Sequence, residues 1–216
     1  MLGTLAPWLL VALVGSAPSA EAWESMYVDE GIQGFTQEVP DSDLFGFKGV
    51  GEIQASVAKL FYVISDAKHE YEWVFLLNEN EVIKQDGPFY RIEHHIYGLP
   101  WPVSNRDFVF EIKAKTVDEK GTVLVTMQSV DFQGMPEPKG VRGRIVSSRF
   151  LLEPLSPNRT KVTVEIFADP AGILPGWAVY LVQRNWPYKT LTGLRKQVLQ
   201  DYTKEAQLPP YEAPAP

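Results

Sequence analysis

Apolar and polar residues alternate over most of the chain after residue 80, which is the period-two pattern of half-buried β-strands. The pattern predicts a series of strands at 80–85, 89–97, 106–116, 122–130, 144–155 and 160–168. The earlier part of the chain predicts a short helix at 23–30, strands at 31–36 and 42–53, a helix at 55–64, and a second short helix at 66–77 that Asp66 caps. The chain is therefore expected to be an α+β protein built on an antiparallel sheet.

One long helix is predicted from Gly176 to about Glu205. Pro187 lies inside it and removes a backbone donor, so a kink is expected near Asn185 and Trp186. A stripe of mainly apolar residues recurs at helical steps of three and four and would pack on the sheet: Trp177, Leu181, Arg184, Tyr188, Leu191, Arg195, Val198 and Tyr202.

Strand parity predicts which side chains face that helix. In the strand 106–116 the expected solvent face carries Asp107, Val109, Glu111, Lys113 and Lys115. The expected inner face of this strand and the next ones carries Arg106, Phe108, Phe110, Ile112, Ala114, Val123, Val125, Met127, Ser129, Val146, Ser148, Phe150, Leu152, Val162, Val164 and Ile166. This inner surface is nearly all apolar. The hydrophobic periodicity of the strands does not distinguish a filled core from one that encloses a cavity.

Length and charge exclude several classes of protein. The 216 residues suffice for one domain with a real core. Lys and Arg number 20 against 27 Asp and Glu, and the resulting net charge of −7 argues against a nucleic-acid partner. The absence of cysteine excludes disulfides, thiolate nucleophiles and Cys-ligated metals.

The two ends of the chain are expected to lie outside the folded domain, which spans 23–207. Residues 1–22 have the form of a signal peptide, with an apolar run at 9–14 and small residues at Ala20 and Ala22. Cleavage before Trp23 would place the protein in the periplasm or outside the cell. An uncleaved anchor is the alternative, although the run is shorter than the roughly 20 residues that span a bilayer. The proline-rich segment 208–216 is predicted to be disordered.

Three segments resemble the START domain family, the StAR-related lipid-transfer proteins, and most closely its secreted bacterial members. Residues 100–109, PWPVSNRDFV, are similar to the family pattern PWP-x-x-x-RD-x-V. Residues 140–142 and 150–155 resemble its VR…W-x-L-x-P-L strand, with Phe150 at the tryptophan position. Residues 169–177 and 187–195 resemble its DPGG-x-IP-x-W entry and last helix. The resemblance covers about 23–207.

The resemblance implies a helix-grip fold, in which a curved antiparallel sheet wraps a long C-terminal helix around a hydrophobic cavity for one lipid-like molecule. It implies a gate formed by the loop 131–140 and the end of the long helix, with Gly134, Met135 and Trp177 as gate residues. The residues expected to contact the ligand are Arg106, Phe108, Phe110, Ile112, Val125, Met127, Ser148, Phe150, Val164 and Tyr188. Arg106 and Ser148 are the candidates for orienting its polar end.

The chain departs from the family at the buried carboxylate–guanidinium pair. Glu93 stands at the carboxylate position, but Ile112 occupies the position expected for the arginine. Parity puts the apolar set Tyr90, Ile92, His94 and Ile96 inside, which turns Glu93 outward unless a bulge intervenes.

The candidate chemistry favours a binding protein over an enzyme. His94 and His95 are adjacent in a strand and point to opposite faces, and His69 is the remaining histidine, so no metal site is predicted. No G-x-S-x-G elbow or phosphate-binding glycine loop occurs, and no cofactor is predicted.

The predicted function is non-enzymatic binding of a phospholipid, fatty acyl or sterol molecule by a monomer that carries it between membranes through transient membrane contact. The alternative is a cyclase- or aromatase-like enzyme of the same superfamily, which would need Glu93, His94 and Arg106 to act together. A structure with Glu93 and His94 facing one cavity would favour the enzyme. A collapsed fold without a cavity, working as an interaction module, is the third possibility.

Overall fold

The computed structural model describes residues 23–38 and 45–211, so the predicted signal peptide and the end of the tail at 212–216 lie outside the described residues. Its strands are β1 (Glu24–Asp29), β2 (Ile32–Glu38), β3 (Phe45–Ile53), β4 (Leu77–Gln85), β5 (Tyr90–Tyr97), β6 (Arg106–Thr116), β7 (Val123–Ser129), β8 (Val141–Arg142), β9 (Arg144–Ser156) and β10 (Arg159–Asp169). They form one sheet in the order β1-β2-β3-β10-β9-β7-β6-β5-β4, and the short β8 pairs with β6.

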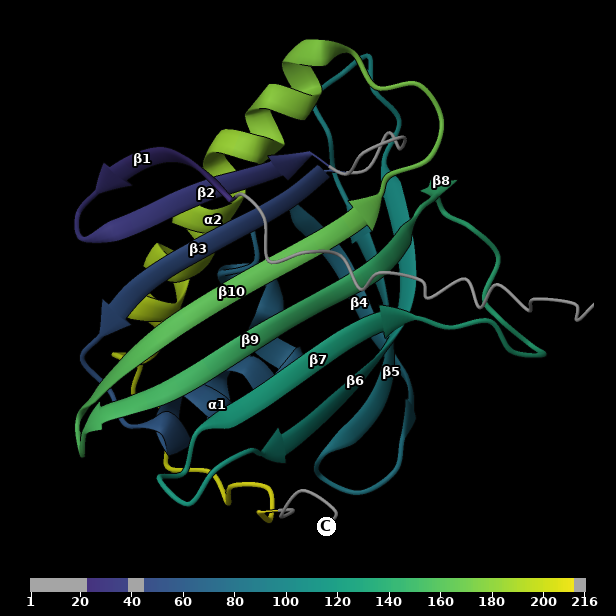
Figure 1. Cartoon of the computed structure of the whole chain (residues 1–216). Helices are drawn as coiled ribbons and strands as arrows, with labels where there is room; N and C mark the ends of the chain where they lie inside the picture. The colour runs from purple at the N-terminus through teal and green to yellow at the C-terminus, as the bar shows by residue number, and fades with distance from the viewer. Residues whose placement is uncertain (1–22, 39–44, 212–216) are drawn as a thin grey trace, which may run out of the picture.

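The sheet curves around two α-helices, as Figure 1 shows. These are α1 (Val57–Ser65) and α2 (Gly176–Gln197), and a 3-10 helix, η1 (Ala67–Glu72), follows α1. All strand pairs along the main path are antiparallel. This arrangement confirms the predicted α+β helix-grip architecture.

Helix α1 falls at the predicted segment 55–64 but begins at Val57, because Ser56 is its N-cap. The Ser56 hydroxyl accepts a hydrogen bond of 3.0 Å from the Lys59 amide, which satisfies one of the free N–H groups of the first turn. Leu60, Phe61 and Ile64 recur at helical spacing and are buried against the sheet. The cap and the apolar face together fix where this helix lies.

Helix α2 packs closely on β3 because glycine leaves room for it. A Cβ atom at Gly49 would lie 3.0 Å from the Cβ of Pro187 and 3.2 Å from Cδ1 of Leu191, which is tighter than ordinary contact. Leu191 and Leu194 are fully buried at this contact. The helical conformation continues through Pro187; the kink expected there stays a prediction.

Two predicted elements near the amino end were wrong. Residues 23–30 form the strand β1 instead of a helix, because Glu30 and Gly31 both adopt positive φ (47° and 72°) and turn the chain back into β2. Asp66 does not cap the next helix; its carboxylate lies 2.7 Å from Nδ1 of His69.

The carboxyl end also differs from prediction. Helix α2 ends at Gln197 rather than near Glu205, and the chain then turns back so that the Ala206 amide donates to the Ala58 carbonyl of α1. The expectation of disorder does not hold for 208–211, since the Thr116 hydroxyl donates to the Pro209 carbonyl at 2.6 Å and the Thr116 amide donates to the Pro210 carbonyl. These bonds fasten the tail to the end of β6.

Candidate functional site

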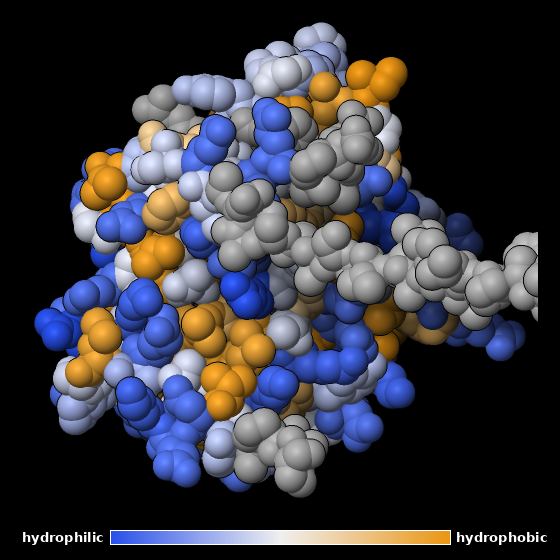
Figure 2. All heavy atoms as spheres, viewed as in Figure 1, coloured by the Kyte–Doolittle hydropathy of each residue, from blue (hydrophilic) through white to orange (hydrophobic). Residues whose placement is uncertain are grey.

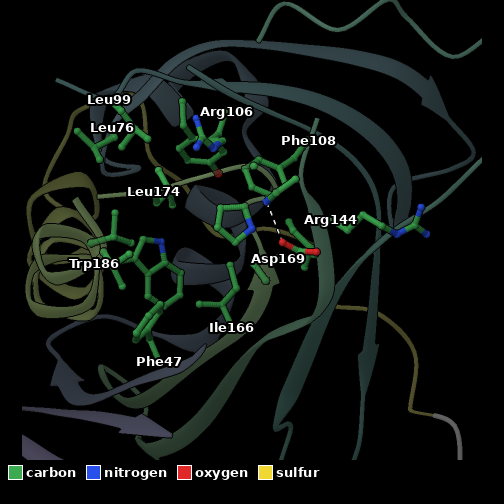
Figure 3. A pocket seen from close by; sticks show the side chains of 18 of the residues that line it. Phe47, Leu76, Leu99, Arg106, Phe108, Arg144, Ile166, Asp169, Leu174 and Trp186 are labelled. Carbon is green, nitrogen blue, oxygen red and sulfur yellow. Dashed lines mark hydrogen bonds between the residues drawn. The ribbon is translucent and has the colours of Figure 1, made fainter. Parts of the chain in front are cut away.

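A cavity of about 950 Å³ lies between one end of the sheet and the first half of α2. Figure 3 shows it from close by. Its volume is near the upper end of the range of roughly 300–1,000 Å³ that is usual for ligand pockets. Most of its lining is apolar, and the lining residues are Phe47, Phe75, Leu76, Tyr97, Leu99, Arg106, Phe108, Arg144, Ile145, Val146, Ile166, Ala168, Asp169, Pro170, Ala171, Gly172, Ile173, Leu174, Val179, Val182 and Trp186.

The apolar walls follow from strand register and helical spacing. Phe47 and Ile166 are cross-strand partners of β3 and β10, so their side chains point to the same face. On α2, Val179, Val182 and Trp186 are spaced by three and four residues and share the side that faces the cavity. The sheet and the helix thus each contribute one apolar wall of the cavity.

The cavity opens beside the loop 169–174. Ile173 lines it and is nonetheless 95% exposed, so the wall ends in solvent there. The Asp169 carboxylate accepts the Ala171 amide at 2.8 Å, and Ala171 and Gly172 take the positive φ values of a tight turn. The loop therefore has a defined shape at the rim.

Arg106 is the charged group furthest inside this cavity. It is 4% exposed, whereas the other charged lining residues, Arg144 and Asp169, are exposed at the rim. One terminal nitrogen donates to the Ser104 carbonyl at 2.6 Å, and the buried Nε has no partner. Burial lowers the pKa of Arg106. A cation thus stands in an otherwise apolar interior.

A buried charge cluster lies next to the cavity, on the inner face of β5. Nε of Arg91 donates to Glu93, and one of its terminal nitrogens donates to Glu70 and to the Ile64 carbonyl, each at 3.1 Å. Nε2 of His95 lies 2.7 Å from Glu93 and 3.1 Å from Glu70. The cluster joins η1 to the sheet, and Glu93 is fully buried in it.

The cluster shifts the pKa values of its members. Burial by itself would raise the pKa of Glu93, but hydrogen bonds and charges from His95 and Arg91 lower it from 4.5 to about 2. Burial by itself would lower the pKa of His95, but its interactions with Tyr97, Glu70 and Glu93 raise it well above 6.5. The cluster therefore favours the ionised form of Glu93 and the protonated form of His95.

The cluster also brings metal-ligand atoms together. Glu70, Glu93 and His95 place one potential ligand atom each within 4.8 Å of one another. The Arg91 guanidinium already supplies a positive charge to both carboxylates, so a divalent ion there would meet a like charge. The arrangement is that of an ion-pair cluster.

A second polar cluster covers the opposite face of the same strands. Nε2 of His94 lies 2.6 Å from the Asp107 carboxylate, which also accepts from Nε of Arg142 and from the Lys139 amide at 2.9 Å. Both His94 and Asp107 are buried. Burial alone would raise the pKa of Asp107, but the hydrogen bonds from His94, Lys139 and Arg142 lower it.

This second cluster explains why parity gave the wrong face for β5. The segment that carries Lys139 and Arg142 folds over the outer face, so both faces of β5 are buried. The parity argument assumes that one face is buried and the other exposed, and it therefore cannot identify the inner face of this strand. Glu93 and His95 face inward, where His95 contacts Phe110 edge-on, and His94 faces outward. Asp107 and Val109, expected on the solvent side, are buried for the same reason.

The residues predicted to contact a ligand divide between cavity and core. Arg106 and Phe108 line the cavity. The other apolar residues of β6, β7, β9 and β10 lie deeper, in the hydrophobic core packed with α1 and the second half of α2: Phe110, Ile112, Val125, Phe150 and Val164. Parity identified the inner face, but which half of it is hollow depends on where the helices pack.

The remaining predicted contact residues do not line the cavity. Met127 is half-buried against the core, and the Ser148 hydroxyl donates to the Glu165 carbonyl at 2.9 Å. Tyr188 packs edge-on against Tyr27. Val146 was expected to face inward; it lines the cavity but is 45% exposed. A register shift in the β9–β10 pair occurs at this point, and Ile145 is buried instead.

The predicted gate residues Gly134, Met135 and Trp177 do not line the cavity. The loop with Gly134 and Met135 is tied to the outer face, where the Pro136 carbonyl accepts from Arg142. Trp177 is 47% exposed at the start of α2. The rim itself is formed by the loop 169–174, which sequence reasoning had placed only as the entry to the helix.

The fold and the site define a class of proteins in which a curved sheet and one long helix enclose an apolar cavity. A model of the START domain family matches residues 13–200, and the chain belongs to this family.

Relatives and a solved structure agree with this family. An uncharacterised protein of Pseudomonas aeruginosa is 30% identical over 195 residues, 87% of this chain and 93% of that protein. The phosphatidylcholine transfer protein of Bos taurus is 25% identical, over 87% of this chain and 89% of that protein. The structure of a STAR-related lipid transfer protein from Xanthomonas axonopodis superposes with a TM-score of 0.72 at 26% identity, covering 83% of this chain and 100% of that chain.

Proposed function

We propose that this protein binds a single lipid-like molecule in the 950 Å³ cavity and carries it between membranes. The observation that carries the proposal is the apolar cavity itself, open at one end beside the loop 169–174. The names of the bovine and Xanthomonas relatives, both lipid transfer proteins, support it.

The physical reason for such a carrier is the cost of moving an acyl chain through water. That cost is about 0.8 kcal/mol per CH₂, or roughly 12 kcal/mol for a 16-carbon chain. The cavity walls are apolar and would shield the acyl chain from water while the protein carries it; they include Phe47, Ile166, Val182 and Trp186. A carrier that lowers this barrier needs neither a nucleophile nor a metal.

The positions of Glu93 and His94 favour a carrier over a cyclase-like enzyme. They lie on opposite faces of β5, and the hydrogen bond of His94 to Asp107 points away from the cavity. Among the described lining residues the titratable side chains are Tyr97, Arg106, Arg144 and Asp169. The acid–base set that the enzyme would require is not gathered at the cavity.

We propose that the protein meets membranes with the end that carries the opening. Trp101 and Ile173 are 92% and 95% exposed, and their loops also contribute Leu99 and Leu174 to the cavity lining. Figure 2 shows apolar residues gathered at the upper edge of the molecule, near the loop that precedes α2. Exposed aromatic and aliphatic side chains favour the bilayer interface.

No helix in the described ranges is long and apolar enough to cross a membrane.

Ile173→Asp is expected to slow lipid transfer between zwitterionic vesicles several-fold, because a charge at this position opposes insertion into the interface. Because Ile173 also lines the rim of the cavity, the affinity for lipid is measured alongside the rate, so that slower transfer can be separated from weaker binding. Transfer of a fluorescent lipid between donor and acceptor vesicles measures the rate. Leu199→Asp, which places the same charge at a 76% exposed position after α2, is the control. Equal rates for the two variants would contradict the membrane-contact proposal.

We further propose that the protein acts outside the cytoplasm, and one experiment tests this together with binding. The full chain is expressed with its leader in a bacterium, and the periplasmic fraction is analysed by native mass spectrometry. We expect the mass of a chain that begins at Trp23, with one lipid bound per chain. A ligand-free mass that persists after incubation with lipid vesicles and sterols would overturn the binding proposal. Recovery of the full-length chain from the cytoplasmic fraction would overturn the proposed location.

A further inference from the structure

We infer that the ligand carries an anionic group, a carboxylate or a phosphate, and that Arg106 binds this group inside the cavity. The inference rests on the proposed function and specifies the head-group chemistry of the lipid-like molecule.

Arg106 is a buried cation with unused hydrogen-bonding capacity. It is 4% exposed, its hydrogen bond to the neutral Ser104 carbonyl uses one terminal nitrogen, and its Nε has no partner. A guanidinium has five N–H donors and remains charged at any pH the protein meets. A buried charge without a counter-charge is strongly unfavourable, so a ligand that supplies the counter-charge gains from it.

The other buried arginine of the described residues shows what Arg106 lacks. Arg91 is 8% exposed and is bonded to two carboxylates, those of Glu70 and Glu93, as well as to the Ile64 carbonyl. No carboxylate of the described residues forms an ion pair with Arg106, and the neighbouring Asp107 is turned to the outer face by its bonds to His94 and Arg142. The protein thus pairs one buried guanidinium internally and leaves the other facing its cavity.

The two charged residues at the rim do not replace Arg106 in this role. Asp169 is exposed and accepts the Ala171 amide. Arg144 is paired with Asp131 at 2.9 Å, and Figure 3 shows its side chain directed away from the cavity. An anion inside the cavity would therefore meet Arg106 first.

The position of Arg106 also suits an amphiphile. Figure 3 shows Arg106 on one side of the cavity and Phe47, Ile166 and Trp186 on the other. An anionic group paired with Arg106 would leave its hydrocarbon chain against this apolar side. Paired hydrogen bonds from a guanidinium to carboxylate or phosphate oxygens are among the stronger ones in proteins.

The test compares anionic ligands with neutral analogues of the same chain length. One pair is a 16-carbon fatty acid and its methyl ester, and the other is a phosphatidic acid and the diacylglycerol with the same chains. Dissociation constants are measured by displacement of a fluorescent lipid at pH 8. In at least one pair we expect the wild-type protein to bind the anion about tenfold or more tightly than the neutral analogue. The pair that shows the preference distinguishes a carboxylate source from a phosphate source.

Variants assign the preference to one side chain. Arg106→Met keeps much of the apolar length and is expected to abolish the preference, whereas Arg106→Lys keeps the charge and is expected to retain part of it. Arg159→Met removes an exposed arginine that does not line the cavity and is expected to leave the preference intact. Thermal melting of each variant shows whether it is folded.

The outcomes separate this inference from the proposed function. Equal affinities of the wild-type protein for anion and neutral analogue in both pairs would overturn the inference and leave lipid binding standing. An unchanged preference in folded Arg106→Met would also overturn it. If none of the four compounds bound to the wild-type protein but a sterol did, the inference would be overturned and lipid binding would stand; if no sterol bound either, the proposed function itself would fail. If Arg106→Met did not fold, the wild-type comparison and Arg106→Lys would still decide the matter.

Discussion

Replacing Glu93 with glutamine is expected to lower the free energy of unfolding by about 3–5 kcal/mol, the range seen when one partner of a buried ion pair is removed. Glu93 is fully buried and is bonded to both Arg91 and His95. Glutamine has nearly the same shape, so the variant leaves little void but removes the negative charge. Arg91 and His95 would then keep Glu70 as their acidic partner in the cluster.

Urea denaturation at pH 7 measures this effect, with the slope compared between variants to confirm that the unfolded states are alike. Glu79→Gln is the matched control, because the salt bridge of Glu79 to Lys139 is exposed on both sides and is expected to contribute less than about 1 kcal/mol. A loss for Glu93→Gln as small as that of the control would show that the buried cluster contributes little to stability.

The difference between wild type and Glu93→Gln is expected to depend on pH in one direction. The pKa of Glu93 is lowered in the folded state from 4.5 to about 2, so its contribution is present above pH 4.5 and is lost as pH falls towards 2. A shift of this size corresponds to something on the order of 3 kcal/mol. The two denaturation midpoints should therefore converge in acid, and a constant gap from pH 7 to pH 3 would contradict the assignment to Glu93.

The strands β6, β7, β9 and β10 could be predicted from the sequence because their signal is local. In β6, Phe110, Ile112 and Ala114 alternate with Glu111, Lys113 and Lys115, and the predicted bounds of 106–116 are those of the structure. A strand with one apolar and one polar face shows its period in a few residues. Helix α1 was predictable for a similar reason, since its apolar residues lie close together in the sequence; its Ser56 cap is a further local signal that the prediction did not use.

The inner face of β5 could not be predicted in the same way, because both of its faces are buried by segments distant in sequence. The outer face is covered by the chain that carries Lys139 and Arg142, and the inner face packs against η1 through Glu70. The sequence nevertheless holds a signal that was missed. Arg91, Glu93 and His95 are ionisable residues at alternate positions, so they share one face of the strand and can bond to one another.

The cavity shows a different limit of sequence reasoning. Parity placed Phe108 and Phe110 on the same inner face, yet Phe108 lines the cavity and Phe110 lies in the packed core. The difference depends on which part of the sheet α1 and α2 cover, and that is a property of tertiary packing. The spacing of Val179, Val182 and Trp186 on α2 was available as a pattern, but it competes with a neighbouring apolar stripe on the same helix.

Val182→Asp is expected to weaken lipid binding about a thousandfold at pH 7. Val182 lines the cavity on α2 opposite the sheet wall, where a hydrocarbon chain would lie. Without lipid the carboxylate can be hydrated in the open cavity, so the fold should tolerate it. With lipid bound, the carboxyl must lose its water and take up a proton. At pH 7 protonating a group with a pKa near 3.9 costs about 4 kcal/mol, which is roughly three powers of ten in affinity.

Displacement of a fluorescent lipid measures this loss, and its pH dependence identifies the cause. Lys189→Asp places the same carboxylate on the exposed part of α2 and is expected to leave the affinity within about twofold of wild type. If protonation of the new carboxyl limits binding, the affinity of Val182→Asp should recover towards the wild-type value as pH falls to about 4. Wild-type affinity of Val182→Asp at pH 7 would mean that the lipid chain does not occupy this cavity, and the proposed site would be wrong. A loss that persisted at pH 4 would point to damaged packing of α2 instead, which thermal melting of the variant would reveal.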